Sequence, residues 1–396
     1  MAGGTRSYEM ARRLVAAGHE VHVITSQREP DNRGSKEWQS SEIDGIHVDW
    51  FPVEYSNNMS YKRRLWAFLR FAWVAGRRAT RIGGNVVFAT STPLTVALPG
   101  VYAAKMLKIP MVFEVRDLWP ELPIATGALR NPFLVRLARW LEHFAYSHSA
   151  RVVALSPGMK AGVVKTGYPE SQVSVIPNGC DNSLFGNLNV NGDEFLAQYM
   201  PKAEGPIVTY AGALGVINGV EYLVDIAAAM LQLDPCVRFL IIGDGREKEN
   251  IRARARELGV LNLNLWMLPR IPKRDMPKVL SASTVATSLF IDLPEMWNNS
   301  ANKFFDALAA GRPIMINYGG WQADLLNETG AGFVVPPRDP EEAARLLHSF
   351  LQDSERVSRS GKAARKLAEE TFDRGKLARK LLAVLEDAVR ERRFRN

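Results

Sequence analysis

The chain of 396 residues has few of the sequence patterns that indicate an oxidising, membrane or secreted environment. It contains two cysteines, Cys180 and Cys236, in no disulfide, metal-binding or redox spacing. No run of eighteen apolar residues occurs, so the sequence predicts no membrane-spanning helix. The first residues, Met-Ala-Gly-Gly-Thr-Arg, lack the basic and then apolar pattern of a secretory signal. We therefore expect a cytoplasmic protein, long enough for two domains with separate cores.

Motifs for metal and cofactor chemistry are also scarce. No Asp-x-Asp sequence occurs, and the six histidines show no metal-ligand spacing beyond His19 and His22, which flank the start of an expected strand. No spacing fits a Ser-His-Asp triad. No Gly-x-Gly-x-x-Gly follows a strand, which argues against a dinucleotide-dependent dehydrogenase. The sequence predicts chemistry without a metal ion or a cofactor.

Acidic residues are missing from one basic stretch of the chain. The formal net charge is +8, so we expect an anionic partner. Residues 61–81 are rich in Lys and Arg, contain no acid, and include Trp66 and Trp73. This composition is typical of a helix on an anionic membrane surface. The alternative is a surface helix whose apolar face packs on the core. No DNA- or RNA-binding signature accompanies it, so we expect no nucleic-acid partner.

Apolar runs alternate with helical patterns along the whole chain, which predicts an α/β protein with parallel sheets covered by helices. In the first half the expected strands are 19–25, 85–89, 111–115 and 151–155, and the segment 173–181 is expected to be a last strand followed by a sharp turn. In the second half they are 207–211, 238–242, 263–267, 284–289, 313–317 and 333–336. We expect two Rossmann-like domains, an N-terminal domain of residues 1–185 and a C-terminal domain of residues 186–374.

One element is missing from this pattern near Met1. A doubly wound domain begins with a strand, a glycine-rich turn and a helix. Here Gly3 and Gly4 lead directly into a helix expected at about 5–17. We therefore expect the first strand of the N-terminal domain to be absent, because of truncation or of an internal start. Loss of a central strand exposes unpaired backbone, so the sequence leaves open whether this chain is active.

The most informative segment is the loop and short helix at 298–312. Ser300 is the expected N-cap, and Gly311 is the expected left-handed residue after the last turn. Lys303 lies at the helix start, where outward backbone amides favour a diphosphate. Asp306, one turn further, can accept hydrogen bonds from two ribose hydroxyls. This pattern predicts a nucleotide-sugar site; the simpler alternative is a solvated charge pair.

The same segment, from Asn298 to Asp306, resembles the donor-site helix of family-4 retaining glycosyltransferases, which have the two-domain GT-B fold. It resembles a branch that adds sugars in bacterial O-antigen and capsule synthesis and is similar to L-fucosamine transferases. That family usually carries two glutamates here, and the corresponding residues are Asn298 and Asp306. The resemblance implies that Asp306 holds the ribose, and that Asn298 replaces the acid that contacts the donor sugar. It also implies that the last helix, about 375–396, crosses back onto the N-terminal domain.

Other landmarks of the resemblance follow in order along the chain. The turn at 175–181 looks like the family's turn between domains, the loop at 211–219 like its second-domain opening loop, and 241–245 like its next glycine turn. In the opening loop, Ala213 or Leu214 and then Asn218 replace the family's usual arginine and lysine. The resemblance implies a donor site with these residues: Gly3, Gly4, Gly212, Gly215, Asn218, Gly243, Gly245, Arg270, Asn298, Asn299, Ser300, Asn302, Lys303 and Asp306.

In the first half the clearest signal is the run from Arg116 to Glu121, Arg-Asp-Leu-Trp-Pro-Glu. It follows an expected strand, so its polar residues lie at the carboxyl edge of the sheet, where open α/β sheets bind ligands. The run resembles the same polysaccharide-synthesis branch. Asp117 or Glu121 is expected to orient the acceptor hydroxyl and Arg116 to face a phosphate, which makes them the candidate catalytic residues. The alternative is a strand-end ion pair with Trp119 as packing.

The residues and the resemblance together predict a metal-independent retaining glycosyltransferase of the hexosyltransferase type. It would move a sugar from a UDP-sugar to a lipid-linked saccharide acceptor in O-antigen, lipopolysaccharide or capsule assembly. We expect it at the inner face of the cell membrane as a peripheral protein. The rivals are a sugar-nucleotide 2-epimerase of GT-B fold and a degenerate GT-B protein that kept the fold without the activity.

Overall fold

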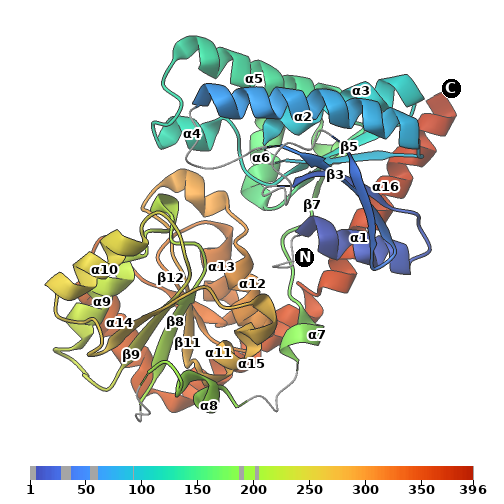
Figure 1. Ribbon diagram of the computed structural model, residues 1–396. Coiled ribbons are helices and arrows are strands. Elements are labelled where there is room, and N and C mark those ends of the chain that lie inside the picture. The colour runs from blue at the N-terminus through green and yellow to red at the C-terminus, as the bar shows by residue number, and fades with distance from the viewer. Residues whose placement is uncertain are drawn as a thin grey trace. The chain divides into compact units, whose positions relative to one another are not determined.

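The computed structural model of the chain describes residues 6–27, 37–53, 61–91, 93–186, 191–200 and 205–395. They form two compact α/β units (Figure 1). One unit consists of residues 178–376, and the other of residues 6–177 together with 377–395. None of the helices in these ranges is long and apolar enough to cross a membrane.

The unit of residues 178–376 contains one continuous sheet. Among the described residues its six strands, all parallel, have the order β10-β9-β8-β11-β12-β13. They are β8 (Ile207–Ala211), β9 (Arg238–Ile242), β10 (Leu265–Leu268), β11 (Val285–Ser288), β12 (Ile314–Ile316) and β13 (Gly332–Val334). In such open sheets, ligands bind at the carboxyl ends of the strands where the order reverses. Here the order reverses between β8 and β11.

Helices pack on this sheet through regularly spaced apolar residues. In α9 (Glu221–Met230), Leu223, Ile226, Ala227 and Met230 follow helical spacing, and all are fully buried against the sheet. The remaining helices are α7 (Asn182–Phe185), α8 (Gly192–Leu196), α10 (Lys248–Glu257), α11 (Met276–Ala282), α12 (Asn302–Ala309), α13 (Trp321–Thr329), α14 (Pro340–Gln352) and α15 (Ser354–Glu370). The core of this unit therefore lies between the sheet and its helices.

The other unit contains two separate part-sheets. The first has the order β1-β3-β2, with β1 (His22–Gln27), β2 (Gln39–Ile43) and β3 (Ile46–Pro52); the second has the order β4-β5-β6-β7, with β4 (Val87–Thr90), β5 (Met111–Val115), β6 (Arg151–Ala154) and β7 (Val173–Val175). Within the described residues, β1 pairs only with β3 and β4 only with β5. No strand precedes α1 among the described residues, and the described strands of this unit form two sheets without hydrogen bonds between them.

Helix α1 (Arg6–Ala16) contacts both part-sheets. Met10 packs with Val112 of β5, and the next residue, Ala11, packs with Val48 of β3. Helix α1 thus links the two part-sheets through side-chain packing, whereas in an unbroken sheet a shared strand links them through backbone hydrogen bonds. The polar start of the same helix adds a second connection.

That second connection is a buried ion pair. Arg6 Nε donates to Glu114 Oε1 at 2.8 Å, and both side chains are almost completely buried. The Arg6 guanidinium also donates to the carbonyl oxygens of Pro177 at 2.6 Å and Ile176 at 2.8 Å. Because Glu114 is the next-to-last residue of β5 and Ile176 follows β7, Arg6 joins the start of α1 to the carboxyl edge of the four-stranded part-sheet.

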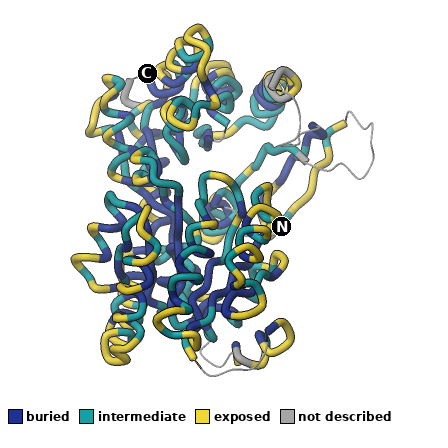
Figure 2. Tube along the Cα trace, turned by 90° about the vertical axis from the view of Figure 1, so that its left-hand side faces the viewer, coloured by how far each residue is buried: buried dark blue, intermediate teal, exposed yellow. Residues whose placement is uncertain are grey.

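The four-stranded part-sheet is covered on both faces. Adjacent residues of β5 point to opposite sides: Phe113 packs in the core with α3 (Ala97–Leu107), whereas Val112 packs with α16 (Arg374–Arg395). The other helices of this unit are α2 (Tyr61–Ile82), α4 (Glu121–Ala125), α5 (Pro132–Ser147) and α6 (Pro157–Lys165). Figure 2 shows the buried residues concentrated along the strands and the inner sides of the helices.

One pair of strands, β2 and β3, was not expected from the sequence. Strand β2 reads Gln-Ser-Ser-Glu-Ile and is mostly exposed, so it gives no apolar signal. Asp44 and Gly45 join it to β3 with positive φ values of 50° and 75°, as a two-residue hairpin turn requires. The Asp-Gly pair was the available signal for this hairpin.

Candidate functional site

Lys303 is at the centre of a polar cluster where the strand order of the continuous sheet reverses. Its Nζ donates to Tyr210 Oη and to Asn218 Oδ1, each at 2.9 Å. Tyr210 belongs to β8, Asn218 lies in the loop after β8, and Lys303 is in the first turn of α12. The Nζ also lies 4.5 Å from the centre of the Tyr210 ring and 5.2 Å from that of Phe290, just after β11. The topology therefore brings these four residues to the expected ligand edge.

The surroundings of Lys303 weaken its charge. Closely packed protein atoms desolvate the ammonium group, and this burial lowers the pKa of Lys303 to about 7. Burial raises the pKa of Tyr210, so its phenol stays neutral and can accept from Lys303 while it donates to the Ala213 carbonyl oxygen at 2.8 Å. An ammonium group has three protons. Tyr210 and Asn218 take two within the described residues, and a ligand oxygen can take the third.

Asp306 has a partner that the sequence did not indicate. Its Oδ2 forms an ion pair with Nζ of Lys273, and both side chains are largely shielded from solvent. Lys273 follows β10, and its Nζ lies 5.3 Å from the centre of the Phe185 ring. Lys303 and Asp306 are thus one turn apart on α12, yet each is held by a different part of the unit. Lys273 was missed because a Pro-Lys-Arg-Asp run is typical of a solvated loop.

Ser300 does not cap the helix, and that expectation was wrong. The N-cap of α12 is Ala301, which makes no side-chain capping bond. Ser300 is buried, and its Oγ accepts from the backbone N–H of Asn178 at 3.1 Å. The hydroxyl therefore fixes the loop before α12 to the segment after β7, which contains Asn178. Gly311 does have the expected left-handed backbone, with φ of 62°.

The three asparagines of the segment lie around the start of α12. Asn298 is half-buried at the end of a 3-10 turn, Pro294–Asn298. Asn299 Oδ1 accepts from the backbone N–H of Ser300 at 2.6 Å. Asn302 is exposed as the first residue of the helix. These residues shape the loop and leave Asn302 available to a ligand.

The expected donor-site glycines are held by contacts between two loops. A Cβ atom on Gly243 would lie 1.9 Å from the Gly212 carbonyl oxygen, and one on Gly245 would lie 2.4 Å from that of Leu214. The loops that follow β8 and β9 therefore touch through their backbones. This close approach explains Gly243 and Gly245 without a ligand.

The remaining donor candidates contribute less to the cluster. Gly215 is half-buried in the same loop as Asn218, and Arg270 is exposed after β10. Gly3 and Gly4 lie outside the described residues.

In the other unit, Arg116, Asp117 and Glu121 follow β5 as expected. The backbone N–H of Arg116 donates to Ser91 Oγ at 3.0 Å, and among the described residues the Arg116 side chain forms no ion pair. Glu121 is exposed at the first turn of α4. Asp117 borders a small pocket at the carboxyl edge of β4 and β5, which is lined by Ser91, Leu94, Phe113, Val115, Asp117, Trp119 and Tyr146.

A buried acid lies beside this pocket and was missed from the sequence. Burial raises the pKa of Glu142 to about 7, and the negative charge of Glu121 adds to the effect. Tyr146, which lines the pocket, donates from Oη to Glu142 Oε1 at 3.2 Å. In the sequence, Glu142 is one of several charged residues in a helix that also has apolar residues. Only the structure distinguishes it, because it is buried with 5% of its surface exposed.

Two family models match the chain, one for each half. Residues 2–179 match the model described as "Glycosyl transferase 4-like domain", and residues 193–367 match "Glycosyl transferases group 1". The chain belongs to the GT-B glycosyltransferases. The fold expected from the resemblance, two Rossmann-like domains of GT-B type, is confirmed.

Relatives and solved structures agree with this assignment. The glycosyltransferase is 25% identical over 309 residues to the probable glycosyltransferase WbjE of Pseudomonas aeruginosa, which covers 76% of the chain and 75% of WbjE. HepE of Anabaena, solved with UDP-glucose, superposes with a TM-score of 0.68 at 18% identity over 93% of the chain and 100% of HepE. WaaG, a glycosyltransferase involved in lipopolysaccharide biosynthesis, superposes with a TM-score of 0.67 at 16% identity over 96% and 95% of the two chains.

Proposed function

We propose that this glycosyltransferase is a retaining enzyme that transfers a sugar, of hexose type, from a UDP-sugar to a lipid-linked saccharide. Its setting is the assembly of cell-surface polysaccharide such as O-antigen or capsule. The observation that carries the donor assignment is the Lys303 cluster where the strand order reverses. HepE, which has the same fold, was solved with UDP-glucose, and WaaG is involved in lipopolysaccharide biosynthesis; both support the proposal.

In this proposal Lys303 binds the diphosphate. The third proton of its ammonium group and the backbone amides at the start of α12 face the same anion. Tyr210 and Asn218 fix the position of Nζ before the donor arrives. When the bond to the sugar breaks, negative charge grows on the leaving UDP. The Lys303 ammonium group is already in position, so it stabilises this charge without reorganisation. No metal ion is required for this step.

Asp306 binds the ribose and Lys273 positions it. Because Lys273 holds Oδ2 of Asp306, the carboxylate is oriented before binding and Oδ1 can accept from a ribose hydroxyl. Asp117 and Glu121 orient the acceptor hydroxyl, and Arg116 faces its phosphate, at the carboxyl edge of β5 in the other unit. Arg270 and the loop residues Gly212, Gly215, Asn298, Asn299 and Asn302 complete the proposed donor site.

The test is release of UDP from donor and acceptor together. Lys303→Ala and Asp306→Ala should each abolish it, whereas Lys366→Ala, which removes an exposed lysine of the same unit, should not change it. Wild-type rates in both site variants would refute the donor assignment. Without acceptor, a new UDP-sugar in place of free UDP would identify a 2-epimerase. No UDP binding at all would identify a degenerate protein.

The membrane part of the proposal rests on the outer side of α2. Ala67, Ala72 and Ala75 are buried, so small residues form the face that packs on the core. Trp66 and Trp73 are 71% and 65% exposed. Large exposed indole rings on a basic helix suit the interface of a membrane, where the ring is partly buried among headgroups.

A second helix extends this surface. Along α5, Phe133, Leu137 and Trp140 recur at helical spacing and are 73%, 48% and 55% exposed. Arg136 and Arg139 lie exposed among them. Both α2 and α5 contact α3. The partner proposed for the exposed sides of α2 and α5 is the anionic inner face of the cell membrane.

Sedimentation with lipid vesicles tests the membrane proposal. The protein should bind vesicles of phosphatidylethanolamine with phosphatidylglycerol and bind poorly to neutral phosphatidylcholine vesicles. The double variant Trp66→Ser and Trp73→Ser should weaken binding at least about tenfold, since the interfacial anchors are lost. Trp297→Ser, an exposed tryptophan of the other unit, is the matched control. Equal binding of all three proteins would contradict the proposal.

A further inference from the structure

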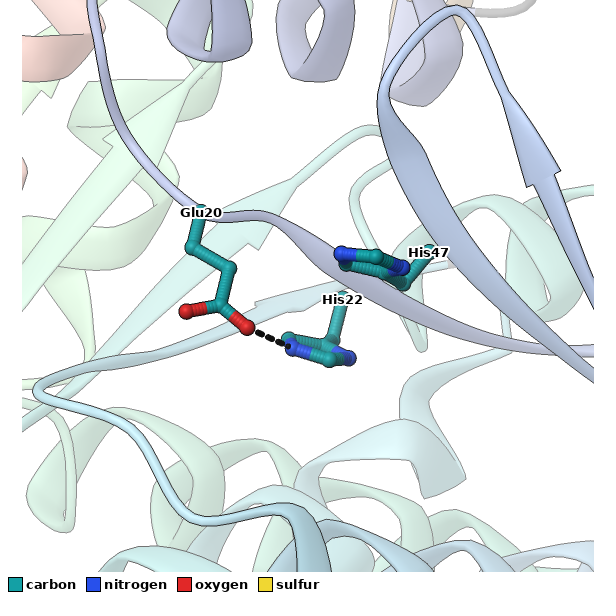
Figure 3. Close-up of side chains that lie close together, drawn as sticks. All are labelled: Glu20, His22 and His47. Carbon is teal, nitrogen blue, oxygen red and sulfur yellow. Dashed lines mark hydrogen bonds and ion pairs between the residues drawn. The ribbon is translucent and has the colours of Figure 1, made fainter.

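Glu20, His22 and His47 bring their side chains together on the three-stranded part-sheet (Figure 3). One ligand-type atom of each residue lies within 4.8 Å of those of the others. All three residues are exposed, so water and ions can reach them. This group could not be predicted from the sequence, because 25 positions separate the two histidines and only the sheet brings them together.

Strand register builds the group. In the parallel pair of β1 and β3, His22 lies directly opposite His47. In the antiparallel pair of β2 and β3, Glu42 lies directly opposite the same His47. Residues opposite one another point to the same face of a sheet. Glu42, His47 and His22 therefore form a row across three strands, and Glu20, two residues before His22, joins it on that face.

The contacts within the row have the polarity of a cation site. Glu20 Oε1 lies 2.8 Å from His22 Nε2. The two imidazole rings stack with their centres 4.8 Å apart. Glu42 Oε2 lies 4.0 Å from His47 Nδ1. Two carboxylates thus flank two imidazoles.

We propose that Glu20, His22 and His47 bind a divalent transition-metal ion, Zn²⁺ in particular, with one carboxylate oxygen and two imidazole nitrogens as ligands. Histidine nitrogen and carboxylate oxygen both bind Zn²⁺ at about 2.0–2.2 Å. Ion binding turns the stacked rings so that their in-plane nitrogen lone pairs converge on the ion, it replaces the Glu20–His22 hydrogen bond, and water completes the coordination. Glu42, whose Oε2 lies 4.0 Å from His47 Nδ1, would close to hydrogen-bonding distance and orient His47, a common role of carboxylates behind zinc-bound histidines, and this leaves Nε2 for the metal.

The bound ion would fasten β1 to β3. Strand β1 is an edge of its part-sheet within the described residues, and a metal bridge from His22 to His47 would add a link at its first residue. Binding to the folded form alone raises stability in proportion to the logarithm of metal concentration. This role belongs to the unit of residues 6–177 and is independent of the donor cluster around Lys303.

Calorimetric titration with ZnCl₂ tests the site on the whole chain. The wild type should bind Zn²⁺ at 1:1 stoichiometry and melt at higher temperature with the metal. Loss of a ligand in His22→Ala or His47→Ala should weaken binding at least about 100-fold, and Glu42→Gln about tenfold, the lower end of the range for residues behind a ligand. The matched control is His19→Ala, which removes an exposed histidine from the same segment outside the group.

Two further results decide the matter. A visible spectrum of tetrahedral Co²⁺ that appears with the wild type and is absent from His47→Ala would support the site without reference to stability. Circular dichroism of the variants should match the wild type, since all the substituted side chains are exposed. Zn²⁺ affinity unchanged in both His22→Ala and His47→Ala, or lowered as much by His19→Ala, would overturn the proposal.

Discussion

The two units hold their sheets together in different ways. In residues 178–376 six strands form one sheet, with its polar cluster where the strand order reverses between β8 and β11. In residues 6–177 the described strands form two part-sheets; α1 contacts both, and the Arg6–Glu114 ion pair joins α1 to the four-stranded one. Hydrogen bonds between strands therefore stabilise the sheet of residues 178–376. In residues 6–177, side-chain contacts contribute more to holding the part-sheets together.

This difference affects what each unit can do. An unbroken sheet fixes the carboxyl ends of its strands, so Lys303, Tyr210 and Asn218 are held at 2.9 Å before any ligand binds. A divided sheet depends on few buried polar contacts, and loss of one partner then leaves the other buried and unpaired. We therefore expect the unit of residues 6–177 to be less stable than the unit of residues 178–376.

The largest predicted effect is that of Arg6→Ala. It leaves the Glu114 carboxylate buried, with the Thr90 hydroxyl as its one remaining side-chain hydrogen-bond donor among the described residues, and it removes the bonds to Ile176 and Pro177. The expected loss of unfolding free energy is about 3–5 kcal/mol. Urea denaturation measures the loss, and hydrogen exchange should rise in β4 and β5 but not in β8 and β9.

The controls for Arg6 separate charge from packing. Arg6→Met combined with Glu114→Gln removes both charges and should recover part of the loss. Arg338→Ala breaks an exposed ion pair with Asp292 in the continuous-sheet unit and should cost less than about 1 kcal/mol. An Arg6→Ala effect as small as that of Arg338→Ala would show that the part-sheets do not depend on this contact.

The next effect is a pH dependence from Glu142. Its pKa is raised from 4.5 to about 7, so the protonated form favours folding. The contribution is fully present below pH 4.5 and is lost as the pH rises through about 7. At about 1.4 kcal/mol for each pKa unit, the wild type loses on the order of 3 kcal/mol across this window.

Glu142→Gln removes the titration and keeps the shape. Urea unfolding at about pH 5 and pH 8 should show the difference between variant and wild type growing in favour of the variant. Tyr146 can still donate to the amide oxygen, so the local packing persists. A difference that is the same at both pH values would contradict the assignment of Glu142 as the titrating group.

The smallest effect is expected from Gly311→Ala in the continuous-sheet unit. At φ of 62° an alanine side chain strains the backbone, so the free energy of unfolding should fall by about 1–2 kcal/mol. Steric overlap adds nothing, since the nearest atoms lie 3.6 Å from the added Cβ. The loss should appear as a small shift in the urea midpoint. Hydrogen exchange should change around α12 and remain unchanged in β4 and β5. Spread of the effect to β4 and β5 would show that the two units do not unfold separately.

Much of the fold could be predicted from the sequence, because it depends on local pattern. The run at 111–115 coincides with β5, and Gly311 ends α12 as its position suggests. Strand β2 was missed because its side chains are polar and exposed, so no apolar periodicity marks it. The Ser300 error has a similar cause, since the residue type fits a cap but a distant backbone amide, that of Asn178, takes its hydroxyl.

The site was predictable only where function and local pattern coincide. Lys303 stood out at a helix start, whereas its partner Tyr210 lies in a run that reads as buried core. Lys273 and Asp306 are 33 positions apart, and no local pattern pairs them. The same holds for His22 and His47, which only strand register brings together. Contacts between distant segments require the folded chain.

The central claim is that Lys303 binds the diphosphate of a nucleotide sugar. Calorimetric titration with UDP between about pH 7 and pH 9 tests it most directly. Because the pKa of Lys303 is about 7 in the unbound protein and an anion raises it, UDP affinity should fall as the pH rises above 7. Lys303→Met should bind UDP at least about tenfold more weakly and lose this pH dependence. Equal affinity and an equal pH profile in the two proteins would contradict the claim.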